Sequence, residues 1–75
     1  MKTIDELIGI GKKQLDDGQY EEALNSFQEA ISLKQNDPDL WYMKGIALRS
    51  LGRYNEAIEC FNKSLEIDPR DKDSS

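Results

Sequence analysis

The sequence contains no histidine and a single cysteine, Cys60. Without histidine the chain lacks the commonest general base and the commonest metal ligand of proteins. One thiol cannot form a disulfide within the chain or a multi-cysteine zinc site, and it fits a reducing compartment. These absences predict that the protein is not an enzyme and holds no metal and no cofactor.

Long apolar runs and an excess of positive charge are also missing. No stretch approaches the roughly 20 apolar residues that a membrane span requires, and residues 1–14 lack the apolar centre of a secretory signal. The 75 residues carry 15 acidic and 10 basic side chains, and the net charge of −5 repels nucleic acid phosphates and anionic membranes. We therefore expect a cytoplasmic protein that binds neither nucleic acid nor membranes.

Three local features come nearest to a catalytic or ligand-binding motif. The adjacent carboxylates of residues 16–17 and 21–22 have no base or nucleophile beside them, so they are interpreted as solvated helix ends. The glycine-rich segment at residues 9–12 lacks the preceding strand and the spacing of a phosphate loop. Cys60 is interpreted as structural, because nothing next to it lowers its pKa and Glu59 raises it.

An internal repeat is the strongest signal in the chain. A shift of 34 residues superimposes eight identical pairs, together with conservative pairs such as Leu24 and Ile58. Periods of about 20 to 50 residues are typical of solenoids, in which each copy is one supersecondary unit. The identical pairs are Asp5 and Asp39, Gly11 and Gly45, Gly18 and Gly52, Tyr20 and Tyr54, Glu22 and Glu56, Ala23 and Ala57, Phe27 and Phe61, and Asp37 and Asp71.

Each copy is predicted to form two helices. In the second half of the first copy, apolar residues from Ala23 to Ile31 fall at i, i+4, i+7 and i+8, and the second copy repeats this pattern. The first halves run from about 3 to 17 and from 38 to 51, each followed by a glycine that suits the left-handed end of a helix. No segment alternates long enough to form a strand, so the sequence predicts an all-α fold.

Two Asp-Pro pairs mark helix ends. The side chain of Asp37 can accept bonds from the free amides of a helix that begins at Pro38, because proline fits the first helical turn. The second pair, Asp68 and Pro69, is expected to stop the fourth helix or to start a fifth.

These residues resemble the tetratricopeptide repeat (TPR), whose signature spaces Trp, Leu, Gly, Tyr, Ala, Phe and Pro over 34 residues. The second copy departs from it at Lys44, where Leu is usual, and at Leu48, where Tyr is usual; the first has Gln14 and Gln35 in place of Tyr and Pro. The matching residues are Leu7, Ile10, Gly11, Gly18, Tyr20, Ala23 and Phe27 in the first copy, and Trp41, Gly45, Gly52, Tyr54, Ala57, Phe61 and Pro69 in the second.

The resemblance implies two tandem helix-turn-helix repeats stacked as an alpha-alpha superhelix, a TPR-like solenoid. We predict one domain over residues 1–75, with repeat 1 at about 4–37, repeat 2 at about 38–71 and a tail at 72–75. Gly11 and Gly45 are expected to face the alanines of the second helices, so that paired helix axes approach closely, with the phenylalanines beside them.

The resemblance also implies a concave groove, lined by the first helix of each repeat, that holds a peptide or a partner helix of another protein. Trp41 is expected in the core. The grip on a C-terminal carboxylate that some family members use is not expected, because Ile8 and Ile46 stand in place of polar residues. The predicted groove residues are Ile8, Lys12, Leu15, Asp39, Tyr42, Ile46 and Arg49, with the neighbouring Asp16 and Ser50.

Two repeats leave an apolar strip without a cover. In repeat 1, Leu24, Ile31 and Leu33 are expected to receive the next helix. Their counterparts in repeat 2 have no helix after them, and such strips usually mark an interface. We expect this strip to pair with a second copy of the chain, or with further repeats if the sequence is a piece of a longer array. The strip residues are Ile58, Leu65 and Ile67.

Overall fold

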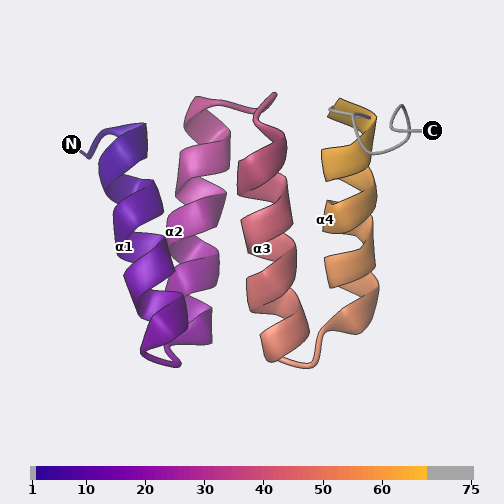
Figure 1. Ribbon diagram of the computed structural model, residues 1–75, viewed down its shortest axis with the longest axis horizontal. Coiled ribbons are helices and arrows are strands. Elements are labelled where there is room, and N and C mark those ends of the chain that lie inside the picture. The colour runs from indigo at the N-terminus through magenta and orange to yellow at the C-terminus, as the bar shows by residue number, and fades with distance from the viewer. Residues whose placement is uncertain (1, 68–75) are drawn as a thin grey trace.

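The computed structural model describes residues 2–67, which form four α-helices joined by short turns (Figure 1). The helices are α1 (Ile4–Asp16), α2 (Tyr20–Leu33), α3 (Pro38–Ser50) and α4 (Tyr54–Ile67). Each helix packs against the next one along the chain, so that α1 and α4 lie at opposite ends of the row. No strand occurs among residues 2–67, and the predicted all-α fold of two helix-turn-helix repeats is confirmed.

The first helix of each repeat begins at a side-chain cap. The Thr3 hydroxyl accepts a bond from the Glu6 amide at 3.2 Å, and the Glu6 carboxylate accepts one from the Thr3 amide at 2.9 Å. The bonds from the Thr3 backbone and side chain lower the pKa of Glu6. At α3, Oδ1 of Asp37 accepts a bond from the Asp39 amide at 3.0 Å, as the sequence predicts.

Equivalent glycines end the first helix of each repeat. Gly18 has a φ of 80° and Gly52 a φ of 83°, which is the left-handed region that residues with a Cβ rarely adopt. The turn at each glycine reverses the chain, and the second helix of the repeat begins two residues later. The predicted helix ends are therefore confirmed at both glycines. The Asp68-Pro69 pair lies outside the described residues.

The core is continuous across the boundary between the repeats because α3 packs into repeat 1. Leu40 and Ala47 of α3 are fully buried; Leu40 belongs to a cluster with residues of α1 and α2, and Ala47 to one with residues of α2 and α4. Their counterparts on α1, 34 residues earlier, are Glu6 and Lys13, and both are exposed. The packing face of α3 is thus apolar, whereas the same face of α1 is polar.

Leu33 does not pack as the sequence predicts. Leu24 and Ile31 are buried under α3, with 8% and 7% of their surface exposed, whereas Leu33 is 53% exposed. Nine residues separate Leu24 from Leu33, and this spacing places them on opposite sides of an α-helix. The prediction for Leu33 was wrong because the alignment of the repeats does not show on which side of the helix a residue lies.

The nearest neighbour of each of these glycines is a phenylalanine. A Cβ built on Gly11 would meet Cε1 of Phe27 at 2.6 Å, and one built on Gly45 would meet Cε1 of Phe61 at 2.5 Å. The expected place of the phenylalanines beside these glycines is confirmed, and the facing of the glycines to Ala23 and Ala57 stays a prediction. The two glycines have matching surroundings, as a true structural repeat requires.

Candidate functional site

The predicted groove residues lie on α1 and α3 and combine apolar with charged side chains. Ile8, Leu15 and Ile46 are half-buried, and Ile8 and Leu15 each pack against a core cluster. Their exposed neighbours are Lys12, Asp39 and Arg49. The structure therefore places half-buried apolar residues and exposed charged residues on these two helices.

Tyr42 is the most prominent aromatic residue of this predicted groove. It is 54% exposed, and its ring centroid lies 5.4 Å from that of Phe61 at an interplanar angle of 47°. Tilted rings at this distance attract one another. The phenylalanine therefore supports the tyrosine ring, which stays largely exposed.

Trp41 points to the other side of α3. Its indole N–H donates a hydrogen bond to the Gln35 carbonyl at 2.9 Å, and its ring packs against both core clusters. The helical spacing places Trp41, Lys44 and Leu48 roughly 150° around α3 from Tyr42 and the other groove residues. Trp41 is a packing residue, as predicted, and a minor part of its surface remains exposed.

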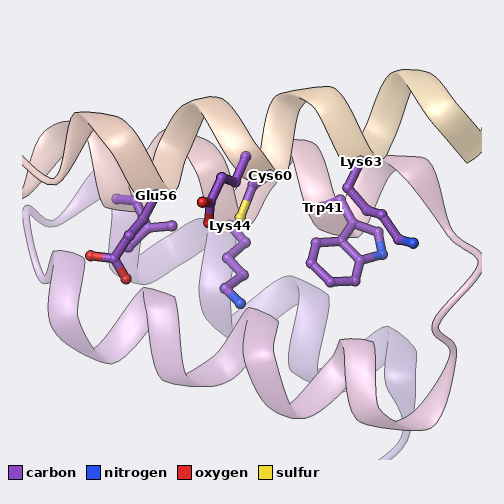
Figure 2. Close-up of a pocket in the computed structure, with 7 residues that line it drawn as sticks. Trp41, Lys44, Glu56, Cys60 and Lys63 are labelled. Carbon is purple, nitrogen blue, oxygen red and sulfur yellow. The ribbon is translucent and has the colours of Figure 1, made fainter.

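Two adjacent cavities open beside Trp41, and we name them together the outer furrow (Figure 2). Both include Trp41 and Lys63, so they adjoin one another. The first, of about 240 Å³, is lined by Trp41, Lys44, Leu48, Glu56, Glu59, Cys60 and Lys63. The second, of about 330 Å³, is lined by Ile31, Gln35, Asn36, Trp41 and Lys63. No predicted groove residue lines either cavity.

Two lysines of the outer furrow stand over the tryptophan. The Lys44 ammonium lies 5.3 Å from the centroid of the Trp41 ring, and that of Lys63 lies 6.0 Å from it. These distances fit attraction between a cation and the face of an indole. Figure 2 shows Lys44 and Lys63 on either side of the ring.

The outer furrow was not predicted from the sequence. The one available signal was Lys44, which occupies a position where the family pattern has an apolar residue. That departure alone does not predict a site, because the sequence does not show which side chains of α4 come to lie beside Lys44.

Cys60 is buried in the floor of this furrow, with 5% of its surface exposed. Burial raises the pKa of its thiol, and the charge of Glu59 acts in the same direction, as the sequence predicts. The charge of Lys44 lowers the same pKa, an effect that the sequence analysis missed. The net rise favours the protonated, unreactive thiol.

Of the three residues of the predicted strip, Ile58 is exposed. Ile58 is 54% exposed, whereas its counterpart Leu24 is 8% exposed. Phe61 and Leu65 are half-buried, whereas the counterpart of Phe61, Phe27, is fully covered. Ile67 is half-buried but lies nine residues after Ile58, and so on the opposite side of α4. Ile58, Phe61 and Leu65 form the face that we call the apolar strip below.

Metal-binding clusters and membrane-spanning helices are absent from the part of the chain that the structure describes. Among residues 2–67, no group of three or more histidine, cysteine, aspartate or glutamate residues is placed to hold a metal ion. No helix in the same range combines the length and the apolar character needed to cross a membrane.

Two helical hairpins with one repeated packing scheme define the class of protein, a solenoid of helix-turn-helix repeats. Two family models match the sequence: one described as "Tetratricopeptide repeat" over residues 38–71, and one described as "TPR repeat" over residues 11–48. The second match crosses the repeat boundary and covers half of the chain. The chain belongs to the tetratricopeptide repeat family.

Several curated proteins are similar in sequence. Uncharacterized protein MJ0572 of Methanocaldococcus jannaschii is 47% identical over 61 residues, which are 81% of this chain and 66% of that protein. TPR repeat-containing protein MJ1428 of the same organism is 29% identical over 92% of this chain and 12% of its own length. The Hsp70-Hsp90 organising protein of Plasmodium falciparum is 40% identical over 77% of this chain and 23% of its own length. The chain thus spans 66% of the first relative and much less of the others.

Proposed function

We propose that the protein is an interaction module that holds a peptide or a partner helix of another protein across α1 and α3. The observation that carries this proposal is Tyr42, a half-exposed aromatic ring supported by Phe61 among exposed charged residues. Buried aromatic anchors surrounded by polar groups are typical of protein interfaces. The groove of this proposal is formed by Ile8, Lys12, Leu15, Asp39, Tyr42, Ile46 and Arg49.

The relatives support an interaction role. The name of the Hsp70-Hsp90 organising protein describes a protein that organises other proteins, and a similar stretch lies within it. Nothing in the described residues resembles catalytic machinery, so we propose a scaffold that is not an enzyme. We also propose that residues 1–75 form one domain, with the repeats divided between residues 37 and 38.

Peptide selection tests this function. The immobilised protein is used to select binders from a displayed library of random peptides, and the selected peptides are then measured by calorimetry. We expect Tyr42→Ala to weaken their binding by about 1 to 2 kcal/mol and Arg49→Ala by about 1 kcal/mol. The matched control is Tyr54→Ala, because Tyr54 is 62% exposed at the start of α4 and lies outside the groove set.

The outcome that contradicts the groove is a set of selected peptides whose affinity does not change in either variant. If those peptides instead lose affinity in Lys44→Leu, the binding surface is the outer furrow. Tyr42→Ala and Arg49→Ala change exposed side chains, so circular dichroism should show that both variants keep the helix content of the wild type.

The exposed strip supports a second candidate function, association with a second copy of the chain. Ile58 and Leu65 occupy positions that are covered by α3 in repeat 1, and in repeat 2 no described residue covers Ile58 to that extent. Burying such apolar surface contributes roughly 25 cal/mol for each Å² removed from water. We propose that this association either replaces peptide binding as the function of the protein or accompanies it.

Sedimentation of the purified protein tests the second function. We expect a dimer that the double variant Ile58→Lys and Leu65→Lys converts to a folded monomer. Leu33→Lys is the matched control, because Leu33 is 53% exposed, nearly the same as Ile58, but lies outside the strip. A wild-type protein that stays monomeric at its highest soluble concentration would refute the association.

A further inference from the structure

The outer furrow shares no lining residue with the predicted groove. Its floor carries the half-buried indole of Trp41 and the apolar side chains of Leu48 and Ile31. The two cavities adjoin at Trp41 and Lys63, and the furrow continues past them to the polar side chains of Gln35 and Asn36. A shape that is long, open and floored with apolar groups fits an extended segment better than a compact small molecule.

The charge around Trp41 is positive although the chain as a whole carries a net charge of −5. No carboxylate of the described residues lies within 4.0 Å of the Lys44 or Lys63 ammonium, since the ion pairs found among those residues involve other cations. Glu59 is the one other charged residue of the lining without an ion pair among those residues. Two cations therefore face one carboxylate in this part of the furrow.

The Glu56 carboxylate is bound by Arg53, although the charge of Lys44 also acts on it. Nε of Arg53 donates to one oxygen of Glu56 at 2.7 Å, and its terminal nitrogen donates to the other at 2.9 Å. This pairing lowers the pKa of Glu56 and raises that of Arg53. Both oxygens of the Glu56 carboxylate are therefore engaged by Arg53.

Lys44 is half-buried, so its aliphatic stem packs in the furrow while its ammonium reaches the tryptophan ring. The corresponding residue of repeat 1 is Ile10, and the family pattern has Leu at this position. An apolar residue there would pack without a charge. The lysine thus adds a cation that the repeat itself does not require.

From this geometry we infer that the outer furrow binds an acidic peptide segment of a partner protein. One carboxylate of the segment pairs with Lys44 and a second with Lys63, and an apolar side chain between them packs against the exposed part of Trp41. Opposite charge selects the segment, and the apolar floor supplies contact area. This site lies on the opposite side of α3 from the groove and is independent of the function proposed for it.

Trp41 is the only tryptophan of the chain, so its fluorescence reports directly on the furrow. The probe is the acetylated and amidated peptide Leu-Asp-Glu-Leu, and its uncharged counterpart is Leu-Asn-Gln-Leu. We expect the acidic peptide to shift the emission in a saturable way and the uncharged one to bind at least about fivefold more weakly. Added salt should weaken the binding of the acidic peptide, because both lysines are partly exposed.

Variants of the two lysines identify the site. Lys44→Leu places the usual family residue at this position, and Lys63→Gln keeps a polar side chain on α4. Each change is expected to lower the affinity for the acidic peptide about fivefold. The double variant should lower it about 25-fold if the two free-energy effects add. Lys12→Gln and Tyr42→Ala, on the groove side, should leave its affinity unchanged. Where a substitution changes the Trp41 fluorescence of the free protein, the titration is repeated by calorimetry.

Three results would overturn the inference. The acidic and uncharged peptides bind equally; the lysine variants, shown by circular dichroism to be folded, keep wild-type affinity; or inorganic phosphate produces the same saturable shift at the same concentrations as the peptide. The last result would show a simple anion site. Loss of binding in Tyr42→Ala alone would assign the peptide to the groove and equally refute the furrow.

Discussion

Gly45 lies so close to Phe61 that a Cβ added to the glycine would fall 2.5 Å from Cε1 of the ring. Gly11 has the same relationship with Phe27, at 2.6 Å. The two contacts differ in their surroundings, because Phe27 is fully buried whereas Phe61 is half-buried within the apolar strip. An identical substitution should therefore have unequal effects in the two repeats.

Gly11→Ala is expected to reduce the free energy of unfolding by about 1 to 3 kcal/mol, because the enclosed Phe27 ring cannot move away. Gly45→Ala should cost less, since Phe61 can shift outward and alanine favours the helix by about 1 kcal/mol over glycine. Urea unfolding followed by circular dichroism measures both. A stable Gly11→Ala, or a larger loss in Gly45→Ala, would contradict the explanation.

Gly9 and Gly18 should respond to alanine in opposite directions. Gly9 lies inside α1 with open space where a Cβ would be, so Gly9→Ala is expected to stabilise the protein by about 1 kcal/mol. Gly18 has a φ of 80°, so Gly18→Ala is expected to destabilise it by about 1 kcal/mol or more. Melting temperatures of the two variants should move to either side of the wild-type value, and a shift in the same direction would refute the assignment of roles.

Repeat 1 carries a polar pair where repeat 2 carries an apolar one. The Ser26 hydroxyl donates to Oε1 of Gln14 at 2.7 Å, and the equivalent positions hold Cys60 and Leu48 in the core. Gln14→Leu alone should cost about 1 kcal/mol, because it leaves the buried hydroxyl without that acceptor. Adding Ser26→Cys should restore most of the loss. A double variant no more stable than Gln14→Leu would show that the repeats do not share this packing.

Stability should depend on the ionisation of Glu6. Its pKa is lowered in the folded protein from the usual value of 4.5, so its contribution is present above about pH 4.5 and is lost as the pH falls through the folded-state pKa. The melting temperature of the wild type should therefore decrease more steeply below about pH 4.5 than that of Glu6→Gln. Glu29→Gln is the control, because the Glu29 carboxylate makes no hydrogen bond or ion pair among the described residues. Parallel curves for Glu6→Gln and the wild type would exclude the effect.

The helices and their ends followed from the sequence because local signals determine them. Asp37 with Pro38 marks one helix start, and Gly18 and Gly52 mark two helix ends, without reference to the rest of the fold. Burial was harder to predict. The alignment of repeats placed Leu33 with Leu24, but only the angle around the helix shows that the two side chains point in opposite directions.

The outer furrow depends on residues that are far apart along the chain. Lys44 and Lys63 come together over Trp41 only after α4 has folded back beside α3. The spacing of Trp41 and Lys44 on one helix is visible in the sequence, whereas the approach of Lys63 is not. The groove residues stay a prediction from the family resemblance, because their role depends on a ligand.

The contrast between α1 and α3 limits how copies of this protein can assemble. Head-to-tail growth would require the face of α1 that carries Glu6 and Lys13 to replace the face of α3 that carries Leu40 and Ala47. Charged groups buried against the apolar strip would oppose such a junction. Copies that meet through their strips would instead form a closed pair with twofold symmetry, which is protected from fibre formation.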